Sequence, residues 1–176
     1  QVKIRAERLK TSSDNLYLLC TTEMVSVKQA LKNVNPDFAI VDSIQTIFDS
    51  EIPSTPGSVT QIRENANFFL NYSKSSGCSV FLIGHITKEG IIAGPKLLEH
   101  VVDIVLSFEG ETRSNLRVLR ASKNRFGSTA EIGVFSMEEH GLQEIPEASS
   151  LFLSSISQNL PGSAISPNQE GSRTLL

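Results

Sequence analysis

One short stretch, residues 37–43 (Asp-Phe-Ala-Ile-Val-Asp-Ser), constrains the fold of this chain more than any other. Its four apolar residues follow one another without the alternation of a half-exposed strand, which predicts a strand buried on both faces. Asp42 and Ser43 close the stretch, at the place where open α/β sheets bind ligands, beyond the carboxyl ends of their strands. Taken alone, Asp42 is better explained as a turn residue after a strand, and the later motifs at 84–88 and 123–127 reverse that preference.

Helical and strand-like patterns alternate around this stretch, which predicts an α/β fold with a mainly parallel sheet flanked by helices. Ser58 and Gln61 form a capping-box pattern at the start of one helix, and Gly77 stands where a C-terminal glycine would end it. The expected core residues of that helix are Val59, Ile62, Ala66, Phe69 and Leu70. The other expected elements are a helix end at 1–10, a strand at 16–20, a helix at 26–34 ended by Asn35-Pro36, and a strand at 79–83.

The second half of the chain has the pattern of an antiparallel extension. Strands are expected at residues 101–108, 116–122, 131–137 and 141–145, the last two as a hairpin. We therefore expect one core over residues 1–145. After Pro146 the composition shifts to Ser, Pro, Gly and Asn, which indicates a linker over 146–169 and a further domain that starts at 170–176. The chain opens without Met and in a helical pattern, so we expect it to begin inside a larger protein.

Composition restricts the cellular setting. The 176 residues suffice for a sizeable core, and 39% hydrophobic and 20% charged residues are typical of soluble proteins. No apolar run approaches the ~20 residues of a membrane helix, and no secretory signal opens the chain. Cys20 and Cys78 both lie in apolar runs, which favours buried, reduced thiols in a cytoplasmic protein over a disulfide or a zinc site.

The net charge of −3 does not indicate nucleic-acid binding by the chain as a whole. Charge is nevertheless uneven, because residues 113–127 contain no acid and five basic residues, Arg113, Arg117, Arg120, Lys123 and Arg125. A local basic strip can contact phosphates in an acidic protein. A solvated hairpin edge explains the arginines before Lys123 equally well.

Two later motifs carry chemistry. Residues 84–88 (Gly-His-Ile-Thr-Lys) follow the strand at 79–83 and should bring His85 to the same sheet edge as Asp42. Residues 123–127 (Lys-Asn-Arg-Phe-Gly) follow an expected strand. Lys123 and Arg125 are two residues apart on an extended segment, so their side chains should point the same way.

With these motifs the chain resembles the bacterial RadA (Sms) family of RecA-like ATPases, which act in recombinational DNA repair. The resemblance covers nearly the whole chain, and Lys-Asn-Arg-Phe-Gly is its most specific part. The other shared motifs, in family order, are residues 42–45, 56–58, 84–88, 93–96 and 98–100. The resemblance implies that residues 1–145 are an incomplete RecA-like core, followed by a Lon-protease-like domain. The family's Walker A loop, catalytic glutamate and N-terminal zinc finger have no counterpart in this sequence, so zinc is not implied for this chain.

The resemblance implies roles in nucleotide chemistry for the sheet-edge residues. Asp42 would be the Walker B residue that holds the Mg²⁺ of bound ATP, through water, and Ser43 and Gln45 would orient that water. His85 would sense the γ-phosphate and move the loop that follows it. For Ser43 and Gln45, structural hydrogen bonding remains an equal alternative, and His85 has the alternative of an ordinary surface residue.

Two loops and the pentapeptide complete the implied site. The loops at 52–58 and 87–96 would face single-stranded or branched DNA and track its backbone. Their candidate contacts are Pro56, Ser58, Lys88, Gly90, Gly94 and Lys96. Lys123 and Arg125 would act as a finger on the γ-phosphate of a neighbouring subunit, with Phe126 anchoring the segment and Gly127 letting the chain turn. The plain alternative is that both cations cap a hairpin.

The implied protein is a cytoplasmic, homo-hexameric, ATP-driven DNA motor that migrates branches of recombination intermediates, with a RecA-type recombinase as a candidate partner and no membrane contact. Two alternatives stay open. One is another RecA-like member, such as a circadian-clock or replicative-helicase core, which predicts a different finger motif. The other is a degenerate or truncated module that serves only in DNA binding or assembly.

Overall fold

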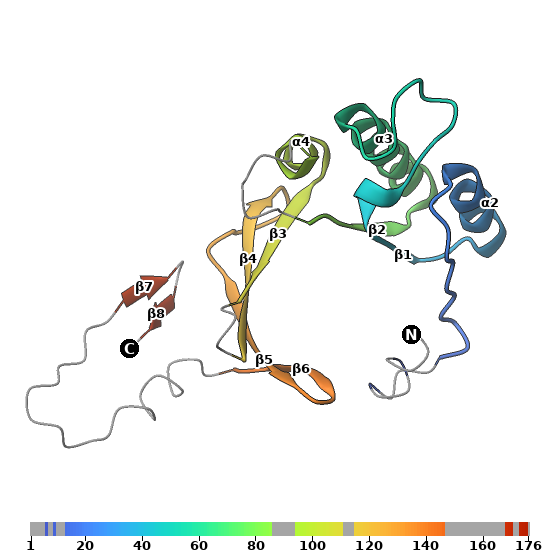
Figure 1. Cartoon of the computed structure of the whole chain (residues 1–176). Helices are drawn as coiled ribbons and strands as arrows, with labels where there is room; N and C mark the ends of the chain where they lie inside the picture. Colours follow the sequence, from blue (N-terminus) through green and yellow to red (C-terminus); the bar gives the residue numbers. More distant parts are fainter. Residues whose placement is uncertain are drawn as a thin grey trace, which may run out of the picture. The chain divides into compact units, whose positions relative to one another are not determined.

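The computed structural model describes residues 13–85, 94–110, 115–146, 168–170 and 173–175, together with Ala6 and Leu9. The chain divides into two compact units, one of residues 14–102 and one of residues 103–176 with residues 1–13. Figure 1 shows both units. Within the described residues, no helix is both long and apolar enough to cross a membrane.

The unit of residues 14–102 is built on two parallel strands. Its elements are α2 (Met24–Val34), β1 (Phe38–Asp42), the 3₁₀ helix η1 (Ile44–Thr46), α3 (Val59–Ser76), β2 (Ser79–Ile83) and α4 (Gly94–Val101). Strands β1 and β2 pair in parallel, in register from Phe38 opposite Ser79 to Asp42 opposite Ile83. The predicted α/β fold class and the parallel pairing of these two strands are confirmed.

Local signals predicted the helix ends closely. Helix α3 begins after Ser58, whose Oγ accepts a hydrogen bond from the backbone N–H of Gln61 at 3.3 Å. It ends at Gly77, which has φ +77°, a left-handed conformation that glycine adopts without strain. Helix α2 begins at Met24, two residues before the expected Ser26, and closes on Asn35 as predicted. Both helices therefore end on a residue in the left-handed conformation.

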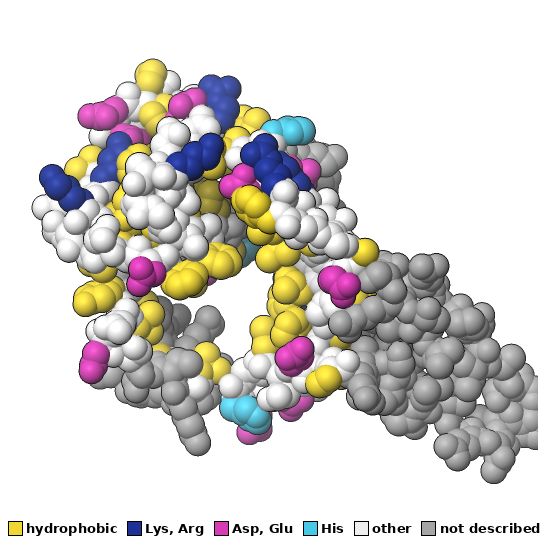
Figure 2. All heavy atoms as spheres, turned by 180° about the vertical axis from the view of Figure 1, so that it is seen from behind, with side chains coloured by type: hydrophobic (Ala, Val, Ile, Leu, Met, Phe, Trp, Pro, Cys, Tyr) yellow, Lys and Arg dark blue, Asp and Glu magenta, His cyan; other side chains and the backbone are white. Residues whose placement is uncertain are grey.

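The core of this unit lies on one face of the strand pair. Its buried members are Met24, Ile44, Ile47, Ile62, Ala66, Phe69 and Leu98, joined by Val41, Val80 and Leu82 from the strands. On the opposite face Phe38 is 67%, Ile40 69% and Phe81 51% exposed. Figure 2 shows hydrophobic side chains, in yellow, exposed at the surface of the described part of the chain.

The prediction of a strand buried on both faces is therefore wrong. None of the described elements covers the face that carries Phe38, Ile40 and Phe81. The expectation that Val59 is a core residue is also wrong, because its side chain is exposed. An apolar side chain is buried only where a second layer packs against it.

The segment at 16–20 also differs from the prediction. It forms no strand, and its apolar side chains, those of Leu16, Tyr17, Leu18 and Leu19, are exposed. Cys20 is exposed as well, whereas Cys78 is buried as predicted. An apolar run becomes a strand only where a neighbouring edge supplies hydrogen-bond partners. The described residues offer no such edge to this segment.

The second unit contains an antiparallel sheet with strands in chain order. These are β3 (Ile104–Glu109), β4 (Leu116–Asn124), β5 (Ile132–Glu138) and β6 (Gly141–Glu144), and the predicted antiparallel extension is confirmed. Ile132 and Val134 form its small core with Val118 and Ile145. Strand β3 begins at Ile104 and not at residue 101, because Val101 ends α4 and packs in the first unit's core.

Further along the chain, β7 (Asn168–Glu170) and β8 (Arg173–Leu175) form a separate antiparallel pair. The first of these strands starts inside the stretch expected as a linker. The proposed boundaries, a core over 1–145, a linker over 146–169 and a new domain from 170, stay predictions.

Candidate functional site

Asp42 and His85 lie side by side at the carboxyl end of the parallel strands. Asp42 is the last residue of β1, opposite Ile83, and His85 follows β2 by two residues. The Nε2 atom of His85 is 3.7 Å from Oδ1 of Asp42, and the two side chains are 74% and 66% exposed. The strand order therefore brings together the two residues that the sequence assigned to one sheet edge, in a position open to a ligand from solvent.

Ser43 lies beneath this surface pair. It is 5% exposed, and its carbonyl oxygen accepts hydrogen bonds from the backbone N–H of Thr46 at 3.1 Å and from Thr46 Oγ1 at 2.8 Å. The peptide bond between Asp42 and Ser43 is cis. The chain passes within two residues from an exposed carboxylate to the fully buried Ile44. Of these three residues, Asp42 is the one whose side chain is accessible.

Gln45 connects the sheet edge to the loop that follows it. Its Nε2 donates a hydrogen bond to the carbonyl oxygen of His85 at 3.3 Å, and its Oε1 is buried without a partner among the described residues. A Cβ atom at Gly84 would lie 3.5 Å from this Nε2, and one at Gly57 would lie 3.6 Å from the Gln45 carbonyl oxygen. Gln45 is therefore positioned to respond to movement at His85.

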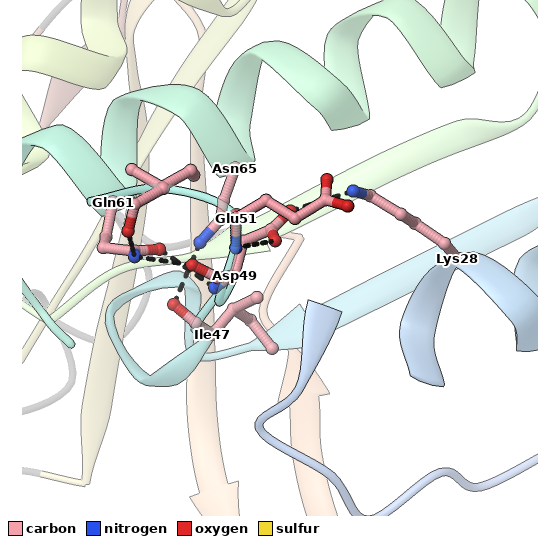
Figure 3. Close-up of polar contacts among 7 residues, drawn as sticks. Lys28, Ile47, Asp49, Glu51, Gln61 and Asn65 are labelled. Atoms are coloured by element: carbon pink, nitrogen blue, oxygen red, sulfur yellow. Dashed lines mark hydrogen bonds and ion pairs between the residues drawn. The ribbon is translucent and has the colours of Figure 1, made fainter. Parts of the chain in front are cut away.

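Gln61 organises the segment between η1 and α3 (Figure 3). Its Oε1 accepts from the backbone N–H of Asp49 at 3.0 Å, and its Nε2 donates to the Asp49 carbonyl oxygen at 2.9 Å. The same Nε2 lies 3.3 Å from the carbonyl oxygen of Ile52 and 3.2 Å from that of Ser54. The expected capping box is thus only half formed, because Gln61 turns to the preceding loop and not to Ser58.

Asp49 carries the buried charge of this segment. Lys28 Nζ lies 2.8 Å from its Oδ2, and the backbone N–H of Glu51 donates to its Oδ1 at 3.1 Å. The hydrogen bond from Lys28 lowers the pKa of the Asp49 carboxyl, against the opposing effect of burial. These contacts stabilise the base of the loop that contains Pro56 and Ser58, two of the predicted DNA contacts.

The predicted DNA contacts fall in three places. Pro56 is exposed on the loop before α3, while Ser58 is occupied as the cap of α3 and contacts Ser54 Oγ. Gly94 and Lys96 lie in the first turn of α4, so this part of the expected loop is helical. Lys88 and Gly90 lie outside the described residues.

The Lys-Asn-Arg-Phe-Gly motif spans the last two residues of β4 and the turn that follows them in the second unit. Asn124 Oδ1 accepts from the N–H of Phe126 at 3.0 Å, and its Nδ2 donates to the carbonyl oxygen of Ser128 at 3.2 Å. Phe126 is 77% exposed, so its expected role as an anchor is wrong for the described part of the chain. The motif is held by the Asn124 amide.

Arg125 is paired with Asp103, a residue that the sequence analysis missed. Arg125 Nη1 lies 3.0 Å from Asp103 Oδ1, and the Arg125 N–H donates to the Asp103 carbonyl oxygen at 3.1 Å. Lys123 lies within β4, opposite Val105 and half-buried. Nothing in the sequence around Asp103 distinguishes it from other surface acids, because its partner lies 22 residues away.

The basic strip is partly neutralised by acids from elsewhere in the sheet. Arg120 Nε lies 3.7 Å from Glu109 Oε2, in addition to the Arg125 pair with Asp103. Arg117 donates from Nη1 to the carbonyl oxygen of Leu116 at 2.8 Å. Arg113 lies outside the described residues. The strip is thus weaker as a phosphate-binding surface than its sequence indicates.

Asp42 has the chemistry that a water-mediated Mg²⁺ site needs. Mg²⁺ usually keeps several waters and takes one or two carboxylates together with substrate phosphates. One exposed carboxylate at a strand end fits that pattern, whereas the described residues contain no group of three or more His, Cys, Asp or Glu that could hold a metal ion alone. A metal bound with a nucleotide is compatible with this edge.

Comparison with known proteins gives close relatives over the whole chain. It is 50% identical over 176 residues to the DNA repair protein RadA of Halalkalibacterium halodurans, 48% to that of Bacillus subtilis and 46% to that of Pseudomonas aeruginosa. Each alignment covers all of this chain but only 38%, 38% and 39% of the relative. No family model matches the chain.

Solved structures give weaker similarities. A RadB recombinase aligns with 68% of this chain and 58% of its own, at 18% identity and a TM-score of 0.47. A KaiC-like protein of Pyrococcus horikoshii OT3 aligns with 69% of this chain and 55% of its own, at 18% identity and a TM-score of 0.43. Both similarities are weak in sequence and in structure.

Proposed function

Because this chain belongs to the RadA family of DNA repair proteins, we propose that it is part of an ATP-dependent DNA motor acting in recombinational DNA repair. In this proposal the full-length parent is a DNA-dependent ATPase that assembles as a homo-hexamer and works in the cytoplasm. It drives branch migration on single-stranded or branched DNA, with a RecA-type recombinase as a partner. ATP and Mg²⁺ are its cofactors.

One observation supports the nucleotide part of this proposal above all others. Asp42, the last residue of β1, and His85, two residues beyond β2, meet at the carboxyl end of a parallel pair with 3.7 Å between Oδ1 and Nε2. Such an edge is the usual ligand-binding position of an open α/β sheet. An acid and a hydrogen-bonding side chain together suit a phosphate with its metal ion.

Each residue of the edge has a distinct task in the proposed mechanism. Asp42 would hold the metal ion through water, and the ion would neutralise charge on the phosphates. His85 contacts the terminal phosphate, and the hydrogen bond from Gln45 to its carbonyl oxygen transmits a change there to the loop before α3. Lys123 and Arg125 act on the nucleotide of a neighbouring subunit, where positive charge stabilises the transition state.

The test is Asp42→Asn in the full-length parent, assayed for DNA-stimulated ATP turnover. The change removes the charge at an exposed strand end, so turnover should be lost while the circular dichroism spectrum and the unfolding temperature stay unchanged. Glu64→Gln is the matched control, since Glu64 is a half-exposed acid that pairs with its neighbour Arg63. Near-normal turnover of Asp42→Asn would contradict the proposal and favour a non-catalytic DNA-binding or assembly module.

We also expect the 176-residue polypeptide by itself not to turn over ATP. Its sequence contains no G-x-x-x-x-G-K-[ST] loop, whose backbone N–H groups and Lys would hold the phosphates. The measurement is Mg²⁺-dependent phosphate release by the purified chain. Turnover above that of a buffer control, abolished by Asp42→Asn, would show that this stretch holds a complete site.

A further inference from the structure

Asp103 and Arg125 are joined twice, once through the backbone and once through their side chains. The Arg125 N–H donates to the Asp103 carbonyl oxygen at 3.1 Å, and Arg125 Nη1 lies 3.0 Å from Asp103 Oδ1. Asp103 directly precedes β3, and Arg125 directly follows β4, whose last ladder pair is Ile104 opposite Asn124. The backbone contact therefore extends the β3–β4 ladder by one further pair. The side-chain contact holds Arg125 at the end of that ladder.

The chain on the other side of Arg125 is fixed as well. The Asn124 side chain accepts from the Phe126 N–H and donates to the Ser128 carbonyl oxygen, which closes the turn. A Cβ atom at Gly127 would lie 3.3 Å from Asn124 Nδ2, so the turn passes close to this amide. The backbone of Arg125 is thus held between Asp103 and the Asn124 turn, and among the described contacts it is Asp103 that directs its side chain.

The guanidinium remains open to a second anion. The Arg125 side chain is 52% exposed and that of Asp103 is 35% exposed. The hydrogen bond to Asp103 uses Nη1, while a guanidinium carries five N–H donors in a planar fork. One edge of the fork can hold the carboxylate while the other contacts phosphate oxygens. Because a half-exposed ion pair adds little to stability, its main effect here is on the direction of a long side chain.

We propose that Asp103 is the positioning residue of the phosphate-directed Arg125, holding its guanidinium in place before the nucleotide arrives. This inference rests on the proposed function. A donor that is already oriented needs no reorganisation when charge develops on the phosphate, which is the source of its effect on rate. Removal of the Asp103 charge should therefore slow turnover without weakening nucleotide binding.

The experiment compares kcat and KM for ATP, with saturating DNA, in the full-length parent. Asp103→Asn keeps the size of the side chain and the backbone contact, and should lower kcat about tenfold to a hundredfold with KM nearly unchanged. Asp103→Glu keeps the charge at a longer reach and should give an intermediate kcat. Glu109→Gln is the matched control, because it removes the Arg120 partner on the same two strands and should leave kcat at the wild-type value.

A double variant separates positioning from any other role. In an Arg125→Ala background, Asp103→Asn should cause no further loss of kcat, since its effect passes through Arg125. The inference would be overturned if the two substitutions lowered kcat independently, so that their losses multiplied in the double variant. A wild-type kcat for Asp103→Asn would also overturn it, as would an equally low kcat for Asp103→Asn and Asp103→Glu. A kcat above wild type would also overturn it, because Asp103 would then withhold Arg125 from phosphate.

The same measurements distinguish the two proposals. If Arg125→Ala retains normal turnover, the finger in the proposed function fails. If Arg125→Ala is inactive while Asp103→Asn is normal, only the positioning role fails. Should Asp103→Asn not fold, Asp103→Glu decides alone: a reduced kcat at unchanged KM supports positioning, and a wild-type kcat overturns it.

Discussion

Lys28 Nζ lies 2.8 Å from Asp49 Oδ2, and this ion pair joins helix α2 to the segment between η1 and α3. The acid is 7% exposed and the lysine 36% exposed, so the charge of Asp49 is buried under its partner. Lys28 Nζ also lies 5.4 Å from the centre of the Phe68 ring of α3. Three elements of the first unit thus meet at one charged pair.

The pair makes the stability of this unit depend on pH. Since the hydrogen bond from Lys28 lowers the pKa of Asp49 below its ordinary value of 3.8, the folded state favours the charged carboxylate. Its contribution to the unfolding free energy is present above pH 3.8 and is lost as the pH falls through the lower, folded pKa. Urea titrations of the 176-residue chain between about pH 7 and about pH 2 should show this decrease.

Lys28→Met should remove that part of the pH dependence and lower the unfolding free energy near neutral pH by about 1 kcal/mol, a value reduced for the solvent exposure of Lys28. Lys32→Met, on an exposed position of the same helix, serves as control and should change neither quantity. Equal behaviour of the two variants would mean that the ion pair contributes nothing.

Gln61→Leu should destabilise the first unit more than a surface change on the same helix. The substitution leaves the Asp49 N–H and the carbonyl oxygens of Asp49, Ile52 and Ser54 without their amide partner. Unsatisfied buried groups of this kind cost about 1–3 kcal/mol. Urea unfolding measures the loss, and Asn67→Leu on a half-buried position of α3 is the control. A smaller loss for Gln61→Leu than for the control would contradict the assigned role.

Lys88 and Lys96 are predicted to contact DNA phosphates in the full-length parent. Replacing both by Ala should weaken binding of single-stranded DNA and make its affinity less dependent on salt, with a slope smaller by about 0.7 for each phosphate that is no longer bound. The measurement is fluorescence anisotropy at a series of salt concentrations. Lys74→Ala, at the exposed end of α3, is the control. An unchanged slope in the double variant would mean that neither lysine touches phosphate.

Arg125 is predicted to act on the nucleotide of a neighbouring subunit. Arg125→Ala in the full-length parent should retain nucleotide binding and lose DNA-stimulated hydrolysis, by about 10³ if it behaves as other arginine fingers in trans. Mixing it with Asp42→Asn should restore partial activity, because some interfaces then combine an intact finger with an intact Asp42. No recovery at any mixing ratio, with mixed rings verified, would indicate action in cis or no action.

The sequence by itself determined the features that depend on neighbouring residues. The cap at Ser58, the helix ends at Asn35 and Gly77, and the apolar strands that end near Asp42 and His85 were all predicted correctly. Backbone hydrogen bonding and glycine's freedom act within a few residues, so their signals lie in short stretches of sequence. Parallel order follows from the alternation of strand and helix.

Only the tertiary structure decided the contacts between distant residues. The pairing of Arg125 with Asp103, the turn of Gln61 away from Ser58 and the exposed face with Phe38 and Ile40 have no sequence signal. An apolar residue is buried only if another element covers it, and a charge is paired only if the fold brings an opposite charge within reach. Both conditions depend on packing between residues that are far apart in the sequence, and a short stretch of sequence carries no information on such contacts.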